Sequence, residues 1–186
     1  AIGTPNTYSA TRVLLLGAGE LGRELTIALQ RMGVEVHAAD RYQGAPAHNV
    51  ANKSYVLDLM EADGLRELIE QVRPHFIVPE IEALAVDVLE EVEDAGVATV
   101  TPTAKAAALT MDRERIRTMV SDNLGIPTCQ HQFASTPEEL HAAAGEIGFP
   151  CVVKPVISSA GRGQSYIGSE DELDAAWDYA LSKVRV

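Results

Sequence analysis

The sequence is poor in cysteine and has no long apolar run. Its only two cysteines, Cys129 and Cys151, do not form a C-x-x-C pair, and its five histidines are scattered along the chain. This excludes a metal site of the zinc-ribbon type, which needs ligands at close and regular spacing. We expect both cysteines to be reduced core residues and the histidines to hold no metal ion.

Membrane and export signals are also absent from the sequence. No stretch approaches the roughly 20 apolar residues that a membrane-spanning helix needs. Residues 1–11 lack the apolar block of a secretory signal. We therefore expect a cytoplasmic location and no membrane partner.

Positive charge is scarce, with 15 basic against 27 acidic residues and a formal net charge of -12. An acidic surface repels nucleic acid and anionic membranes, so neither is expected as a partner. Any phosphate group would have to be bound by local groups. With 186 residues and 46% hydrophobic composition, the chain can bury a core and hold one full domain with part of a second.

Apolar segments that alternate with helical patterns make up the first part of the chain. Strands are expected at residues 12–16, 34–39, 55–57, 75–79 and 97–100, with helices after Gly17, at 65–72 and at 83–94. This alternation predicts an α/β fold, a Rossmann-like doubly wound parallel sheet. Ligands of such sheets bind beyond the carboxyl ends of the strands.

The pattern changes after Pro102, and we place a boundary near Thr110, which gives domains 1–110 and 111–186. Helices are expected at 104–109 and 112–123, followed by a break at Gly125. The second domain should then contain a strand at 129–133, a helix at 137–147, strands at 151–156 and 164–167 around a glycine-containing loop, and a final helix from Glu170.

Residues 17–22, Gly-Ala-Gly-Glu-Leu-Gly, match G-x-G-x-x-G directly after a strand. Asp40 ends the next strand at the distance expected for an acid that binds a ribose. Taken alone, this pattern indicates a dinucleotide site. Glu20 opposes that interpretation, because its carboxylate would repel a pyrophosphate. A tight strand-to-helix turn without any ligand is the third interpretation.

Glu80 also follows an apolar strand, so Glu20 and Glu80 can face the same crevice. Two carboxylates suit a ligand that carries an amine or several hydroxyls. The alternative is that Glu80 caps the acidic helix expected at 83–94.

Lys154 falls within the apolar strand expected at 151–156, where a solitary buried ammonium would need an anionic partner. The loop 158–164 follows, and it is small and flexible enough to fold its N–H groups over phosphates, with Arg162 adding charge. It is not a Walker loop, because no G-K-[ST] follows. The alternatives are a lysine at a strand edge and an ordinary hairpin turn.

A strand, lysine and proline followed by Ser-Ser-x-Gly-Arg-Gly resemble the ATP-binding module of the ATP-grasp superfamily. Five pieces of the sequence together resemble the formate-dependent phosphoribosylglycinamide formyltransferases, over nearly the whole chain: residues 17–22, 40–42, 78–83, 110–113 and 150–156. The resemblance implies a pre-ATP-grasp domain followed by an incomplete ATP-grasp subdomain.

The family uses ATP to activate formate as formyl phosphate, which the amine of glycinamide ribonucleotide attacks. Carried over by motif, the residues that would bind glycinamide ribonucleotide are Glu20, Leu21 and Glu80. Those that would bind ATP are Arg113, Lys154, Ser159, Ala160, Gly161, Arg162, Gly163 and Gln164. No residue has the setting of a covalent nucleophile.

The resemblance also implies Mg²⁺ as a cofactor beside ATP, formate as a small-molecule substrate, and a homodimer. The family's magnesium-binding acids would lie beyond Val186, so no metal ligand is expected in these residues and the chain alone is expected to be inactive. Three alternatives stay open, and one of them is a noncatalytic fragment or binding module. A NAD(P)-dependent oxidoreductase would explain Asp40 and leave Lys154 unexplained, and another ATP-grasp ligase of the carboxylase type would share the second domain.

Overall fold

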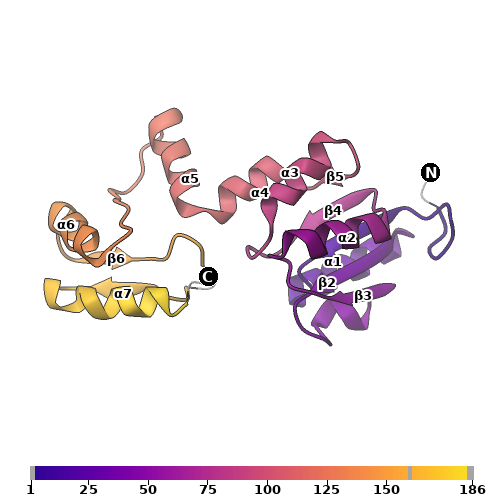
Figure 1. The fold of residues 1–186 in the computed structure, drawn as a ribbon, viewed down its shortest axis with the longest axis horizontal. Helices are drawn as coiled ribbons and strands as arrows, with labels where there is room; N and C mark the ends of the chain where they lie inside the picture. The colour runs from indigo at the N-terminus through magenta and orange to yellow at the C-terminus, as the bar shows by residue number, and fades with distance from the viewer. Residues whose placement is uncertain (1–2, 159–160, 184–186) are drawn as a thin grey trace. The chain divides into compact units, whose positions relative to one another are not determined.

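The computed structural model describes residues 3–158 and 161–183. The chain divides into two compact units, Ala1–Ala108 and Leu109–Val186, whose elements are labelled in Figure 1. This division falls close to residue 110, where the sequence predicts the boundary between domains 1–110 and 111–186; that domain boundary stays a prediction.

Unit 1 contains a five-stranded parallel sheet with the strand order β3-β2-β1-β4-β5. At the carboxyl end of the central strand, Leu16 pairs with Ala39 on one side and with Pro79 on the other. The strands are β1 (Arg12–Leu16), β2 (Glu35–Asp40), β3 (Lys53–Val56), β4 (Phe76–Pro79) and β5 (Thr99–Val100). All five predicted strands are present, with ends shifted by at most two residues, and the predicted doubly wound sheet is confirmed.

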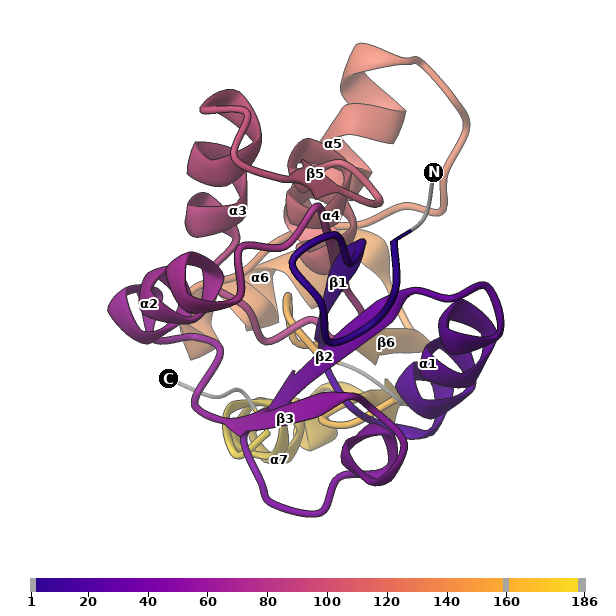
Figure 2. The same ribbon diagram turned by 90° about the vertical axis from the view of Figure 1, so that its right-hand side faces the viewer.

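Helices cover both faces of this sheet. Figure 2 shows α1 on one side and α2 with α3 on the other. The helices that pack on the sheet are α1 (Glu20–Arg31), α2 (Ala62–Val72) and α3 (Val86–Asp94), and the short 3-10 helix η1 is Pro46–Asn49. Helix α4 (Ala104–Met111) follows β5 and spans the division between the units.

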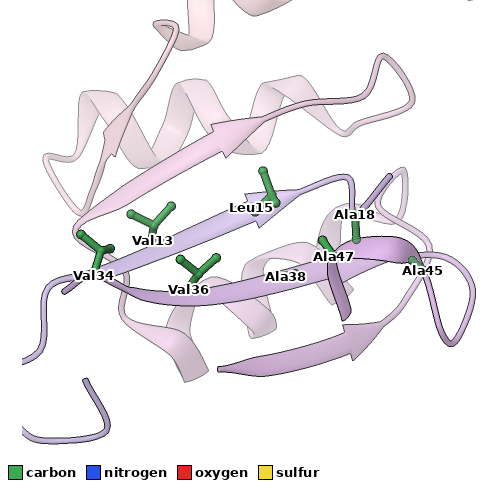
Figure 3. Packing of buried hydrophobic residues seen from close by; sticks show 8 residues of the cluster. All are labelled: Val13, Leu15, Ala18, Val34, Val36, Ala38, Ala45 and Ala47. Carbon is green, nitrogen blue, oxygen red and sulfur yellow. The ribbon is translucent and has the colours of Figure 1, made fainter. Parts of the chain in front are cut away.

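The core of unit 1 lies on the two faces of β1. Val13 and Leu15 join a cluster with Val36 of β2, seen in Figure 3, against which Leu25 and Leu29 of α1 pack. Leu14 and Leu16 alternate with them and also have no exposed surface. Each fully buried leucine stabilises the fold by about 1.5–3 kcal/mol relative to an exposed one. This packing fixes the end of β1, where the glycine turn begins.

A buried polar network lies at the other end of β2. Glu35 Oε1 is 2.7 Å from His37 Nε2, and His37 Nδ1 is 2.9 Å from the Tyr55 hydroxyl. The Asn6 backbone N–H donates to the second oxygen of Glu35. The network therefore ties the segment before β1 to the first residues of β2.

Unit 2 is a two-stranded antiparallel sheet packed against two helices. A cluster of Ala144, Ile167, Leu173 and Ala176 joins the sheet to the helices. Its elements are α5 (Arg113–Thr118), a π-helical turn η2 (Met119–Asn123), α6 (Pro137–Ile147), β6 (Cys151–Val153), β7 (Ser165–Ile167), the 3-10 helix η3 (Glu170–Glu172) and α7 (Leu173–Leu181).

Three predictions for this part of the chain are wrong. Residues 129–133 form no strand, because β6 pairs only with β7 among the described residues and leaves this segment without a partner. Lys154 follows the end of β6 and is exposed, so it is not the buried strand lysine that was expected. Cys129 is exposed and Cys151 is only half-buried, so neither is a full core residue.

None of the helices in the described ranges is long and apolar enough to cross a bilayer.

Candidate functional site

The turn after β1 is held by hydrogen bonds to the neighbouring strands. The Gly17 N–H donates to the Ala39 carbonyl at 2.9 Å, and the Ala18 N–H donates to Asp40 Oδ2 at 2.8 Å. Gly17 has φ +108°, a conformation that favours glycine. A Cβ on Gly22 would lie 2.9 Å from the Gly17 carbonyl oxygen. The first turn of α1 therefore packs closely against the glycine turn because residue 22 has no side chain.

Glu80 follows β4 and turns its carboxylate toward this glycine turn. Its N–H donates to the Leu16 carbonyl at 2.8 Å, which sets it beside the end of β1. Oε2 lies 2.5 Å from the position that a Cβ on Gly17 would occupy, and Oε1 lies 4.0 Å from the corresponding position on Gly19. Oε2 is buried and has no hydrogen-bond partner among the described residues.

The electrostatic setting of Glu80 favours a ligand that donates a hydrogen bond. Burial raises the pKa of the Glu80 carboxyl, and the nearby carboxylates of Asp40 and Glu82 raise it further. A cationic or hydrogen-bond-donating group at Oε2 would offset each of these effects. An anionic group would worsen them.

Asp40 is committed to the protein's own backbone. Its side chain is buried, Oδ2 accepts from Ala18, and Oδ1 accepts from the Arg41 N–H at 2.7 Å. A carboxylate that binds a ribose must present its oxygens to the ligand, whereas both oxygens here accept from backbone N–H groups of the protein. Together with the Glu80 carboxylate against Gly17, this arrangement disfavours the dinucleotide interpretation.

Glu20 and Leu21 are the first two residues of α1, and both are exposed. They begin the helix that leaves the same turn against which Glu80 lies. The structure therefore brings the three predicted substrate residues to one edge of the sheet. Glu80 does not cap the acidic helix, because α3 begins only at Val86 and has Ala85 as its N-cap.

The glycine loop of unit 2 has one open and one packed glycine. Gly161 and Gly163 both have φ +72°. A Cβ on Gly161 would meet nothing within 4 Å, whereas one on Gly163 would lie 2.7 Å from Pro155 Cγ and 3.3 Å from Ala180 Cα. The loop therefore docks against the last turn of α7 through Gly163.

The charged residues predicted for this loop lie at its surface. Lys154 and Arg162 are exposed, and the Gln164 N–H donates to the Gly161 carbonyl at 3.3 Å. Ser159 and Ala160, also predicted to bind ATP, lie outside the described residues.

Arg113 contacts the segment that leads into the loop. Nη1 donates to the Pro155 carbonyl and, at 2.9 Å, to the Ser158 hydroxyl, while Nη2 donates to the Ser158 carbonyl at 3.2 Å. The sequence analysis missed Ser158. The only signal in the sequence was its place as the first residue of the loop 158–164.

Two family models match the chain. The ribonucleotide synthetase preATP-grasp domain matches residues 10–111. The chain belongs to the ribonucleotide synthetase preATP-grasp family. The ATP-grasp domain matches residues 119–186 of this preATP-grasp protein, a range that includes Lys154 and the glycine loop. The superfamily resemblance inferred from the motifs is thereby confirmed.

Curated relatives of this preATP-grasp protein are formate-dependent phosphoribosylglycinamide formyltransferases. The relative from Corynebacterium glutamicum (strain R) is 59% identical over 186 residues, which are 100% of this chain and 46% of the relative. The relative from Burkholderia pseudomallei (strain 668) is 55% identical over 185 residues, again 100% of this chain and 46% of the relative. The chain spans about half the length of the curated relatives it matches, and the family resemblance inferred from the sequence is confirmed.

Solved structures share the fold. A structure described as glycinamide-RNase-transformylase T from Mycobacterium tuberculosis matches with a TM-score of 0.72 at 41% identity, over 85% of this chain and 43% of that chain. A carboxyaminoimidazole ribonucleotide synthase from Aspergillus clavatus, complexed with ATP, matches with a TM-score of 0.82 at 24% identity, over 93% of this chain and 45% of that chain. The second likeness is evidence for the fold alone.

Proposed function

We propose that this protein takes part in the ATP- and formate-dependent formylation of glycinamide ribonucleotide, a step of purine biosynthesis. The terminal phosphoryl group of ATP passes to a formate oxygen and gives formyl phosphate and ADP. The substrate amine then attacks the formyl carbon, the bond from that carbon to the phosphate oxygen breaks, and the nitrogen loses a proton. On this proposal, the full-length protein is an enzyme.

The observation that carries the proposal is the buried, unpartnered oxygen of Glu80. A buried acceptor without a donor costs about 1–3 kcal/mol, and an amine or hydroxyl of a ligand would supply the donor. Glu20 and Leu21 begin α1 beside the same turn. We assign Glu20, Leu21 and Glu80 to glycinamide ribonucleotide, a substrate suggested by the relatives, which are phosphoribosylglycinamide formyltransferases.

We assign ATP to unit 2. Lys154, before the glycine loop, and Arg162, within it, are exposed cations, and loop N–H groups with such charges offset the charge of phosphates. The proposed ATP residues are Arg113, Lys154, Ser159, Ala160, Gly161, Arg162, Gly163 and Gln164. Their work is to bind and orient, since holding reactants in place is itself a large part of such catalysis.

Two rival functions fit less well. An oxidoreductase that uses NAD would need a free carboxylate at the end of β2, and both oxygens of Asp40 are engaged by backbone N–H groups. A carboxylase-type ATP-grasp ligase would share the fold, but the solved example above is 24% identical, whereas the curated formyltransferases reach 55–59%.

Further parts of the proposal concern the whole protein. We propose that Mg²⁺ accompanies the ATP phosphates. Within residues 3–158 and 161–183 there is no group of three or more histidine, cysteine, aspartate or glutamate residues suited to a metal ion. That the side chains which bind Mg²⁺ lie beyond Val186 stays a prediction. A homodimer and a cytoplasmic location are proposed on the same resemblance.

Calorimetry tests the substrate site directly. We expect glycinamide ribonucleotide to bind the chain saturably, and the Glu80→Gln variant to bind at least about tenfold more weakly, since about 1.4 kcal/mol corresponds to a factor of ten. Glu82→Gln is the matched control, because it removes the same charge from an exposed neighbouring residue.

Three measurements decide between the possible functions: this titration, a titration with reduced dinucleotide, and an activity assay of the full-length protein. Equal weakening by both variants would show a general charge effect and overturn the role of Glu80. Binding of reduced dinucleotide in place of the ribonucleotide would overturn the proposal in favour of the oxidoreductase. ATP- and formate-dependent formation of the formylated ribonucleotide by the full-length protein would establish the reaction itself.

A further inference from the structure

Arg113 and Ser158 join two segments that lie 45 residues apart in the sequence. Arg113 is the first residue of α5. Its guanidinium donates hydrogen bonds to the Pro155 carbonyl and to the hydroxyl and carbonyl of Ser158. Its backbone N–H donates to the Val156 carbonyl at 3.2 Å. The side chain and the backbone of one residue thus hold Pro155, Val156 and Ser158 on the path from β6 into the glycine loop.

The positive charge of Arg113 is not neutralised by this arrangement. No described carboxylate forms an ion pair with Arg113, and its partners are carbonyl and hydroxyl oxygens. Arg113 has an acid on each side in the sequence, Asp112 and Glu114; Asp112 accepts from the N–H groups of Glu114 and Arg115 and caps α5. A net cation therefore remains beside the start of the loop.

Pro155 connects this interaction to the far side of the loop. Its carbonyl accepts from Arg113, and its ring lies 2.7 Å from the position of a Cβ on Gly163. The residues that Arg113 holds are therefore the surface on which the returning limb of the loop packs. Loss of the Arg113 contacts would release both limbs.

We propose that Arg113 and Ser158 form a brace that positions the loop residues 161–164 for a nucleoside triphosphate. This inference rests on the proposed function as an ATP-dependent enzyme. Ser158 acts through Arg113 as a positioning residue. Arg113 also acts through the loop, because Nη1 and Nη2 donate to oxygens of Pro155 and Ser158.

A measurement without nucleotide tests the brace itself. Arg162 is exposed, so trypsin can cut the chain between Arg162 and Gly163. We expect Ser158→Ala to speed this cut several-fold, while Ser158→Thr keeps the hydroxyl and the slow rate. Ser121→Ala is the control, since the Ser121 hydroxyl donates only within its own helical segment. An unchanged rate in Ser158→Ala would overturn the brace.

Kinetics of the full-length protein test what the brace does. We expect Ser158→Ala to raise the KM for ATP about tenfold, the lower end of the effect of losing one hydrogen bond to a charged group, and to leave the KM for the ribonucleotide unchanged. Ser158→Thr should restore the KM for ATP.

A double-mutant cycle separates positioning from direct contact. If Ser158 acts through Arg113, the double variant Arg113→Met with Ser158→Ala should be no weaker for ATP than Arg113→Met alone. Additive effects would overturn the inference and make the two residues independent contacts. A wild-type protein without ATP-dependent activity would refute the proposed function, while the trypsin experiment would still judge the brace.

Discussion

The carboxylate of Glu80 fills the space that a side chain on Gly17 would need. The distance from Glu80 Oε2 to an ideal Cβ on Gly17 is 2.5 Å, a separation that real atoms do not adopt. The first glycine of the turn is therefore favoured both by its backbone conformation and by the carboxylate beside it. In a dinucleotide site the same position is kept small so that a tight turn can form.

A substitution of Gly17 should be far more costly than one at an open turn. We expect Gly17→Ala to lower the free energy of unfolding by about 3 kcal/mol, because it combines a strained φ of +108° with contacts to Glu80 and to Ile81 Cγ2 at 2.6 Å. Gly44→Ala is the control, with φ +75° and nothing within 4 Å, and should cost about 1 kcal/mol. Urea unfolding of both variants measures the difference; similar losses would mean that Glu80 moves aside freely.

Glu80 should reduce stability at neutral pH, as the cost of its function. Its folded pKa is raised above the ordinary value of 4.5, so the folded state holds the proton more tightly than the unfolded chain. The free energy of unfolding therefore falls as the pH rises from about 4.5 through the raised pKa, because the folded protein must then give up the proton of Glu80.

Removal of this charge should therefore stabilise the fold while it weakens the site. We expect Glu80→Gln to raise the free energy of unfolding by about 1 kcal/mol at pH 7 and to flatten its decline above pH 4.5. Urea unfolding across this pH range gives both numbers. A variant that is less stable than the wild type at neutral pH would contradict the prediction.

The two loop glycines offer a matched pair, since both have φ +72°. We expect Gly161→Ala to cost about 1 kcal/mol from its backbone conformation alone. Gly163→Ala should cost about 1–3 kcal/mol more, because its Cβ would meet Pro155 Cγ at 2.7 Å and Lys183 Cβ at 3.2 Å. Thermal or urea unfolding decides between them, and equal costs would mean that the loop is not docked on α7.

An ion-pair cluster links α6 to the start of α7 and makes this link pH-dependent. The hydrogen bond from His141 to Asp174, and to a smaller extent the one to Glu170, raise the pKa of the His141 imidazole above 6.5. The stabilisation is thus fully present below about pH 6.5 and is lost as the pH rises through the raised folded pKa.

His141→Gln should remove this dependence. We expect hydrogen exchange of α6 and α7 to become faster in the wild type between about pH 6 and about pH 8, after correction for intrinsic exchange, and to change less in the variant. His131→Gln is the control, because the His131 ring interacts with the Cys129 carbonyl and the Phe133 ring of its own segment. An identical pH response of wild type and His141→Gln would refute the role of the cluster.

The fold of unit 1 could be predicted because its central strands β1 and β2 are buried on both faces. An apolar run such as Arg12–Leu16 between turn residues leaves few other possibilities, and helical patterns between such runs specify the crossovers. Unit 2 was predicted less well. A segment such as 129–133 has the composition of a strand, but composition does not supply the neighbouring strand whose hydrogen bonds it needs.

The candidate site shows the same limit. The position of Glu80 at a strand end could be read from the sequence, but the burial of one oxygen against Gly17 depends on packing between positions far apart in the chain. Asp40 matched the spacing of a ribose ligand, and only the structure reveals that its oxygens accept from Ala18 and Arg41. Side-chain hydrogen bonds of this kind leave no periodic trace in a sequence.

Asp40 also makes the segment after β2 a suitable place for a reporter. Asp40 accepts from Ala18 at one end of the segment, and at the other end the Ala47 N–H donates to the Ala18 carbonyl at 2.9 Å. The four residues 41–44 between these anchors are exposed. A fluorophore on Gln43→Cys, in a Cys129→Ser background, would sit beside the site on a fixed base and convert ligand binding into an optical signal.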